Sequence, residues 1–160
     1  MGGSAVTLDL RGIPEAQKML GRLSHADFLA EHKAISEALI VDSIEAWDKE
    51  ADPETGKSWA DWSPVTKAAK EKKYKGKRGE VKKKLIGEFA LLRKSVSNEA
   101  TAQSAIIAYN RPYARIHQLG GEAGRRDARV TIPARPYMGE GEFTRSAIED
   151  AIERLTGGAL

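Results

Sequence analysis

Apolar side chains recur at helical spacing in two long stretches of the chain, which predicts two main helices. The first stretch covers 24–50 and is stopped by Asp52 and Pro53, a pair that cannot continue a helix. The second covers 142–155, near the end of the chain. Shorter helical patterns occupy 13–23, 65–75, 81–92 and 113–119.

Strand patterns are shorter and fewer. Residues 5–10 alternate between apolar and polar, and 95–97 and 105–109 flank a polar turn, which predicts an antiparallel hairpin. A further short strand is predicted at 130–132, after a polar arm at 122–129. Together these elements predict an α+β fold in which a small antiparallel sheet packs against the 24–50 helix and the C-terminal helix. We expect a single domain over 1–160 with a flexible tail at 156–160.

Two tryptophans lie in or beside the loop at 52–61, which is rich in glycine, proline and polar residues. An exposed indole is unfavourable in water, so we expect Trp59 and Trp62 to fold back onto the core. The alternative is that one of them anchors a partner protein.

Composition narrows the class of protein. The 160 residues include no cysteine, which excludes disulfides and thiolate metal sites. Hydrophobic residues make up 41% of the chain, but none of the apolar runs has the length of about 18 residues that a membrane span needs. The first residues show no secretory signal. We therefore expect no membrane association.

The charge is unevenly distributed. Segment 67–84 contains ten basic residues and two acidic ones, although the net charge of the chain is only +3. This basic segment predicts an exposed extension that contacts acidic protein or nucleic acid, and the alternative is a solvated loop. A Gly-x-x-Gly sequence at 76–79 is a weak signal of nucleic-acid binding, and a basic turn between helices is the favoured explanation. The candidate residues are Lys72, Lys73, Lys77, Arg78, Lys82, Lys83 and Lys84.

Catalytic patterns are missing from the sequence. It has no His-Glu-x-x-His, no Gly-x-Ser-x-Gly and no Walker loop. We therefore expect no enzyme activity, no metal and no cofactor. A small hydrolase, such as one acting on cell walls, is a disfavoured alternative because no acid–nucleophile pair stands out.

Two motifs carry a resemblance to a known family. The sequence YARIHQLGG covers 113–121, and IPARPYMG covers 132–139. With a Pro-x-x-Gly-x-x-Trp loop at 53–59, these motifs resemble the phage virion morphogenesis proteins, which include tail completion proteins of contractile-tailed and Mu-like phages. The motif residues singled out are Tyr113, His117, Gln118, Gly120, Gly121, Pro133, Arg135, Pro136 and Tyr137.

The resemblance implies a structural tail-completion or head–tail connector subunit. Such a protein would form a homo-oligomeric ring, expected to be hexameric, around the DNA channel in the virion neck, after assembly in the host cytoplasm. Its expected partners are copies of itself, neighbouring neck, connector or tail-tube proteins, and packaged DNA. A nucleic-acid-binding module built on 67–84 is the alternative.

The polar motif residues have simpler roles as well. His117 and Gln118 can satisfy backbone groups at a turn. Arg135 stands between two prolines on a stiff strut. It could pair with a carboxylate of a neighbouring subunit or form an internal salt bridge. We expect the two motifs to lie close together.

Overall fold

The computed structural model describes residues 27–75, 83–86 and 89–157, together with 17, 18, 20, 21 and 23. The predicted strand at 5–10 lies outside the described residues. So do most of the predicted helix at 13–23 and residues 158–160 of the predicted tail.

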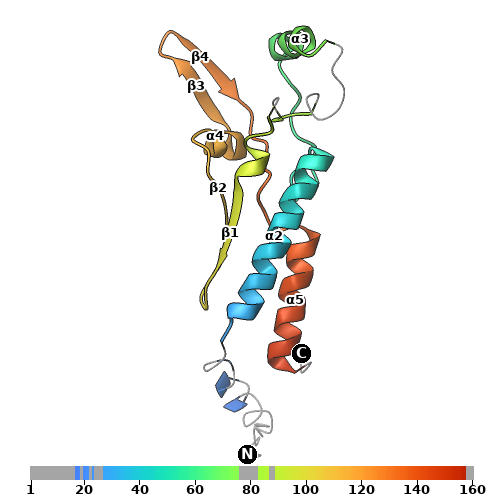
Figure 1. Cartoon of the computed structure of the whole chain (residues 1–160), viewed down its shortest axis with the longest axis vertical. Coiled ribbons are helices and arrows are strands. Elements are labelled where there is room, and N and C mark those ends of the chain that lie inside the picture. The colour runs from blue at the N-terminus through green and yellow to red at the C-terminus, as the bar shows by residue number, and fades with distance from the viewer. Residues whose placement is uncertain are drawn as a thin grey trace, which may run out of the picture.

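The body of the molecule confirms the predicted α+β fold. Helix α2 (Leu29–Lys49) lies between helix α5 (Glu142–Thr156) and a hairpin of strands β1 (Val96–Ala100) and β2 (Ala105–Tyr109) (Figure 1). Helix α2 begins later than the apolar pattern predicts: Phe28 is its N-cap, and Asp27 Oδ1 accepts a hydrogen bond from Leu29 N at 3.0 Å.

The β1–β2 hairpin is tied to α2 by polar contacts. Its antiparallel register runs from the pair Val96–Tyr109 to the pair Ala100–Ala105. Asn98 Nδ2 donates to Ser36 Oγ at 3.1 Å, and His32 Nδ1 lies 2.8 Å from the Thr101 carbonyl oxygen. The hairpin tip is therefore fixed to the first half of α2.

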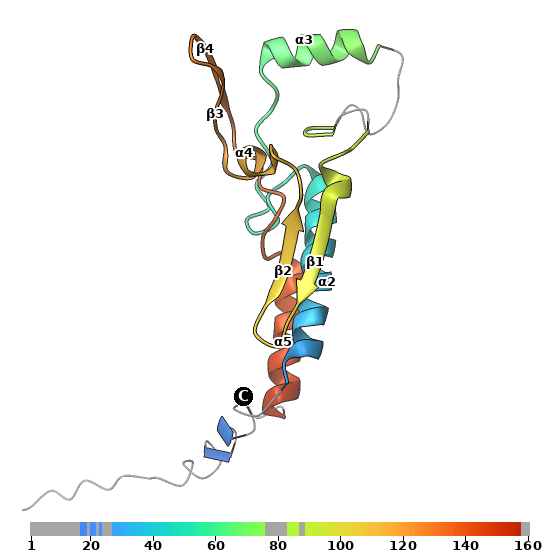
Figure 2. The same cartoon turned by 60° about the vertical axis from the view of Figure 1, so that its left-hand side comes forward.

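Two arms stand at the end of the body opposite the C-terminus (Figures 1 and 2). One is helix α3 (Pro64–Lys73), which begins as predicted, with Ser63 Oγ accepting from Thr66 N at 3.3 Å. The other is a hairpin of β3 (Gly121–Arg125) and β4 (Ala128–Ile132), which follows the short helix α4 (Ala114–Leu119).

The sequence pattern missed β3 because glycine weakens a strand signal. At Gly124 the backbone has a φ of +107°, and a Cβ there would lie 2.4 Å from the Ala128 carbonyl oxygen. Only glycine allows the two strands to approach in this way.

The helix predicted at 81–92 is wrong. The described residues 83–86 and 89–92 form turns that lead into the short 3-10 helix η2 (Arg93–Ser95). Leu85 and Ala90 have left-handed backbone angles, with φ of 60° and 48°. The helical spacing of apolar residues instead reflects Ile86 and Leu92, which reach the core from separate turns.

Trp59 is buried, as predicted, but Trp62 is not part of the core. Trp59 packs edge-on against Trp47, with ring centroids 5.7 Å apart. Trp62 is only half-buried, and the Lys70 ammonium lies 4.4 Å from its ring centroid. A cation over an indole face is a favourable use of a partly exposed ring.

Candidate assembly interface

The two sequence motifs meet, as predicted, where α4 faces the extended segment 133–139. The Arg135 backbone N–H donates to the His117 carbonyl oxygen at 2.8 Å. A Cβ at Gly120 would lie 2.8 Å from Ala134 N, so a side chain at this position would force the two segments apart. The β3–β4 hairpin leaves and returns at this junction (Figure 2).

Gln118 holds the two motifs together. Its Oε1 accepts from Tyr137 N at 2.9 Å and from Met138 N at 3.1 Å. Its Nε2 donates to the Met138 carbonyl oxygen at 2.8 Å. One amide therefore satisfies three main-chain groups of the second motif, which is the role predicted for this residue.

Replacing Gln118 with alanine should lower the free energy of unfolding by about 2–3 kcal/mol, because three partly buried backbone groups lose their partner. Gln118→Glu should cost less, since a carboxylate still accepts from both N–H groups. Urea denaturation of both variants tests this, with exposed Gln103→Ala as the matched control. A Gln118→Ala midpoint equal to that of the control would contradict the role.

A chain of buried hydrogen bonds lies under the second motif. Trp47 Nε1 donates to the Tyr109 hydroxyl at 3.3 Å, and that hydroxyl lies 2.6 Å from Ser43 Oγ. Ser43 Oγ donates its one proton to the Tyr137 carbonyl oxygen. In the pair of hydroxyls, Tyr109 is therefore the donor and Ser43 the acceptor. Burial, with Tyr109 nearby, raises the pKa of Tyr137, whose phenol donates to the Ala114 carbonyl oxygen.

Arg135 does not meet a carboxylate within the described residues. Its Nε donates to the Ala60 carbonyl oxygen and its Nη2 to the Asp61 carbonyl oxygen, both at 3.0 Å. The predicted internal salt bridge is therefore replaced by two main-chain contacts. Trp59 Nε1 adds a bond to the Pro136 carbonyl oxygen at 2.6 Å. Both side chains fasten the 59–61 loop to the second motif.

His117 contributes its backbone carbonyl rather than its ring. Its Nδ1 is buried and has no hydrogen-bond partner in the described part of the chain, contrary to the predicted role as a turn donor. Burial, and then the nearby Arg135 charge, lower the pKa of His117. Both effects favour the neutral form of the imidazole in the folded protein.

The lowered pKa of His117 predicts a pH dependence of stability. Below a pH of about 6.5 the unfolded chain gains a proton at this ring, which the folded chain binds only at a lower pH. The unfolding free energy should fall as the pH drops through that range. His117→Gln should remove this part of the slope in denaturation curves recorded from pH 7.5 to 5. If the His117→Gln variant kept the wild-type dependence of unfolding free energy on pH, that dependence would come from other titratable groups.

The motif junction divides into an inside and an outside. Gln118, Arg135 and Tyr137 face the protein interior, whereas Tyr113 and Leu119 are 40% and 64% exposed. A hollow of about 370 Å³ lies beside them, where α4 meets the base of β3. Its described lining consists of Pro112, Arg115, Ile116, Leu119, Gly120, Gly121 and Glu122.

The basic segment 67–84 also contains both residues that contact the body and residues that are exposed. Lys83 Nζ lies 3.2 Å from Asp48 Oδ1, and Lys84 Nζ donates to the Trp59 carbonyl oxygen at 3.0 Å. These two lysines therefore hold the 83–86 turn to the body, contrary to the prediction that they lie on an exposed extension. Lys72 and Lys73 are exposed on α3. Lys77, Arg78 and Lys82, with the Gly-x-x-Gly sequence, lie outside the described residues.

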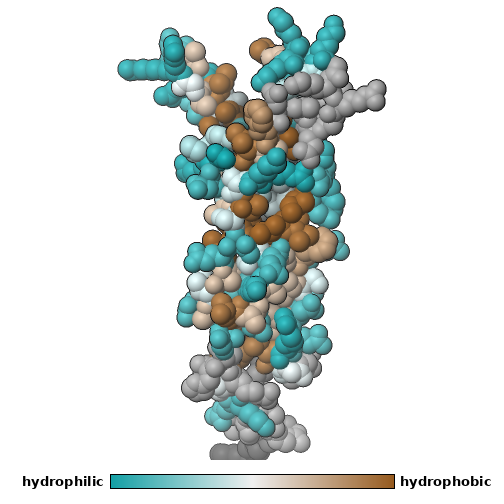
Figure 3. All heavy atoms as spheres, in the orientation of Figure 1, coloured by the Kyte–Doolittle hydropathy of each residue, from teal (hydrophilic) through white to brown (hydrophobic). Residues whose placement is uncertain are grey.

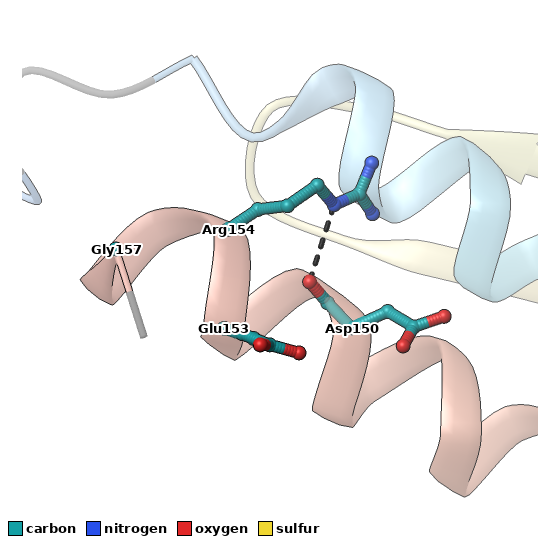
Figure 4. A pocket seen from close by; sticks show the side chains of 4 residues that line it. All are labelled: Asp150, Glu153, Arg154 and Gly157. Atoms are coloured by element: carbon teal, nitrogen blue, oxygen red, sulfur yellow. Dashed lines mark hydrogen bonds between the residues drawn. The ribbon is translucent and has the colours of Figure 1, made fainter. Parts of the chain in front are cut away.

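A further hollow lies at the C-terminal end of α5, lined in the described region by Asp150, Glu153, Arg154 and Gly157 (Figure 4). Arg154 Nε donates to the Asp150 carbonyl oxygen at 3.2 Å. The described residues contain neither a cluster of three metal-binding side chains nor a helix able to cross a bilayer.

Comparison with known proteins connects this arrangement to phages. The phage virion morphogenesis family matches residues 8–156. The putative capsid assembly protein G of Escherichia phage Mu is 30% identical over 155 residues, covering 97% of this chain and 95% of that protein. The Mu-like prophage FluMu G protein 2 of Haemophilus influenzae is 50% identical over 44 residues, covering 28% of this chain and 31% of that protein. No solved structure matches the chain. The chain therefore belongs to the phage virion morphogenesis family, a family of structural proteins of virion assembly.

Proposed function

We propose that this protein is a tail-completion or head–tail connector subunit that forms a hexameric ring in the virion neck. Family membership supports a structural role in assembly. The observation that carries the finer proposal is the pair of arms, α3 and the β3–β4 hairpin, at one end of the body (Figure 2). A place between head and tail also agrees with the name of the Mu relative, because a connector touches the capsid.

No residue of either arm is buried in the described chain, and α3 is held to the 83–86 turn through Lys70, whose Nζ donates to the Lys83 and Ile86 carbonyl oxygens at 3.2 Å each. Helix α3 has 10 residues and none of them is buried. Isolated helices shorter than about 12–15 residues are marginal in water. Arms of this kind gain order from a partner, which suits an adaptor that docks on neighbouring proteins.

The experiment is a phage lysate made without this protein. We expect separate heads and tails by electron microscopy, and joined particles when the protein is restored. Quantitative mass spectrometry of the restored particles should then give a hexameric copy number, with images placing the ring on the particle axis. Joined particles in its absence, or a single copy off the axis, would overturn the proposal.

The exposed lysines of the α3 arm should contact an acidic partner or packaged DNA. Lys67 and Lys72 on α3, and Lys75 just after it, are exposed, and their side chains form no hydrogen bond or ion pair with other described residues. Replacing all three with glutamine should change the unfolding free energy by no more than about 0.5 kcal/mol each. It should lower the yield of joined particles, and any DNA affinity should lose about 0.9 of its logarithmic salt slope per lost phosphate contact.

The matched comparison replaces Lys83 and Lys84 with glutamine. Because these lysines hold the 83–86 turn, this pair should lower the melting temperature more than the α3 triple variant does. If the triple variant joins particles at the wild-type yield and salt dependence, α3 is only a solubilising arm.

A further inference from the structure

The β3–β4 hairpin has one apolar and one polar face. Residues opposite each other in an antiparallel pair share a face, and successive pairs alternate between faces. The apolar face carries the pairs Gly121–Ile132, Ala123–Val130 and Arg125–Ala128. The other face carries Glu122–Thr131 and Gly124–Arg129, with an ion pair of 2.9 Å between Arg129 and Glu122.

The apolar face is uncovered in the described structure. Val130 is 60% exposed, and the hairpin packs extensively on no other described helix or strand. A lone two-stranded hairpin is marginally stable in water, and the apolar face of a sheet normally packs against another layer. The amphipathic pattern therefore fits a hairpin that is covered after assembly.

This face continues into the hollow beside α4. A Cβ at Gly121 would point at Ile116, 3.6 Å from its Cγ1, so the apolar side of the hairpin is the side that looks towards α4. Leu119 adds a side chain that is 64% exposed. Figure 3 shows hydrophobic side chains on the hairpin arm and at its base, with polar ones at the tip. The result is one concave apolar corner.

Charge identifies the surface that fits this corner. Segment 111–132, which forms the corner and the hairpin, contains five arginines and two acidic residues. Two such hairpins would repel each other if they met face to face. An apolar surface that carries acidic side chains would complement both features of this corner.

The outer side of α5 has this character. The helix contains four acidic residues and two arginines, and both arginines already donate to main-chain carbonyl groups, at Glu54 and Asp150. Glu149 and Glu153 are exposed and form no ion pair with other described residues. Phe143 and Ile152 are 45% and 43% exposed, and because they are nine residues apart on a helix they flank this acidic strip on its two opposite edges.

We propose that a second copy of this chain covers the apolar face of β3–β4 with the acidic outer side of its α5. The two surfaces lie on different parts of one subunit, so the contact is heterologous, the type that closes into rings. This inference rests on the proposed homo-oligomer and names its interface.

Site-specific photo-crosslinking inside assembled particles tests the contact. A benzophenone amino acid replaces Val130 in one variant and Thr131 in the control, because these neighbours lie on opposite faces of the hairpin. We expect a product of twice the 17.5 kDa chain only from position 130, joined to a peptide of α5. A crosslink to another virion protein or another segment of this chain, or none in particles that contain the protein, overturns the inference.

Charge exchange gives a second measurement. Arg125→Glu with Arg126→Glu, or Glu149→Arg with Glu153→Arg, should each lower incorporation into particles about tenfold, and the combined variant should restore it. Lys33→Glu with Lys94→Glu is the matched control on other exposed positions. Failure of the combination to restore incorporation overturns the contact. A single wild-type copy per particle would instead overturn the proposed function, whatever these variants do.

Discussion

Replacing Trp47 with alanine is expected to lower the free energy of unfolding by about 3–5 kcal/mol, which is much of the stability of a domain this size. Trp47 is fully buried, and its ring lies 4.9 Å from that of Tyr137 and 5.7 Å from that of Trp59, centroid to centroid. It therefore joins α2 to the second motif and to the 59–61 loop. Its loss leaves a cavity and removes the donor to Tyr109.

Urea denaturation followed by circular dichroism measures the effect without depending on indole fluorescence. Trp62→Ala is the matched control, because Trp62 is half-buried and contacts mainly the Lys70 ammonium. That control should lose about 1 kcal/mol or less. Equal losses in the two variants would mean that the core does not centre on Trp47.

The elements that the sequence predicted well are those whose burial repeats with a regular period. Helices α2 and α5 each bury one side, and the β1–β2 hairpin has one apolar strand, β2, on the far side of a polar turn from Val96. Such patterns come from local geometry alone, so one sequence is enough to see them. The Ser63–Pro64 start of α3 was readable for the same reason.

The elements that were missed are those set by contacts between distant segments. Leu85 and Ala90 adopt left-handed angles because Ile86 and Leu92 must reach the core around them, and helical spacing cannot show this. Strand β3 contains Gly121 and Gly124 and buries nothing in the described chain, so it carries little periodic signal.

The motif junction was only partly predictable. The family resemblance located both motifs. Their proximity was predicted because the chain between them leaves along one segment and returns along another. The resemblance could not show that Gln118 binds three main-chain groups or that Arg135 binds the 60–61 carbonyls. The role of Arg135 depends on where a loop 75 residues earlier in the chain comes to lie, and the role of Gln118 depends on how the second motif aligns with α4.

Asp42 is a residue that no sequence pattern singles out. It looks like one more acidic position on a helix, yet it is 3% exposed. Its Oδ2 accepts from Gly141 N, Thr144 N and Thr144 Oγ1, at 3.1, 2.8 and 2.5 Å. Its Oδ1 accepts from Phe143 N at 3.2 Å. Helix α5 has no side-chain cap of its own, so α2 supplies the cap across the helix pair.

Replacing Asp42 with alanine should therefore lower the free energy of unfolding by about 3–4 kcal/mol. The variant leaves the N–H groups of the first turn of α5 buried without an acceptor, and it removes a negative charge from the positive end of the helix dipole. Asp42→Asn keeps one oxygen acceptor but turns an amide donor towards those N–H groups, so its loss should be intermediate. Gly141 must stay glycine, because a Cβ there would lie within van der Waals overlap of the Asp42 carboxylate.

Hydrogen exchange at 141–144 is the decisive measurement for Asp42, because those amides should lose protection before the rest of the body does. Asp48→Ala is the matched control on the same helix: its carboxylate pairs with Lys83 and Arg93 near the surface and should contribute about 1 kcal/mol or less. If the Asp42 variant has the same melting temperature as the Asp48→Ala control, α5 is held by its apolar face alone. If α5 loosens first, incorporation into particles should fall with it, because the acidic side of α5 is the surface proposed to cover the next hairpin.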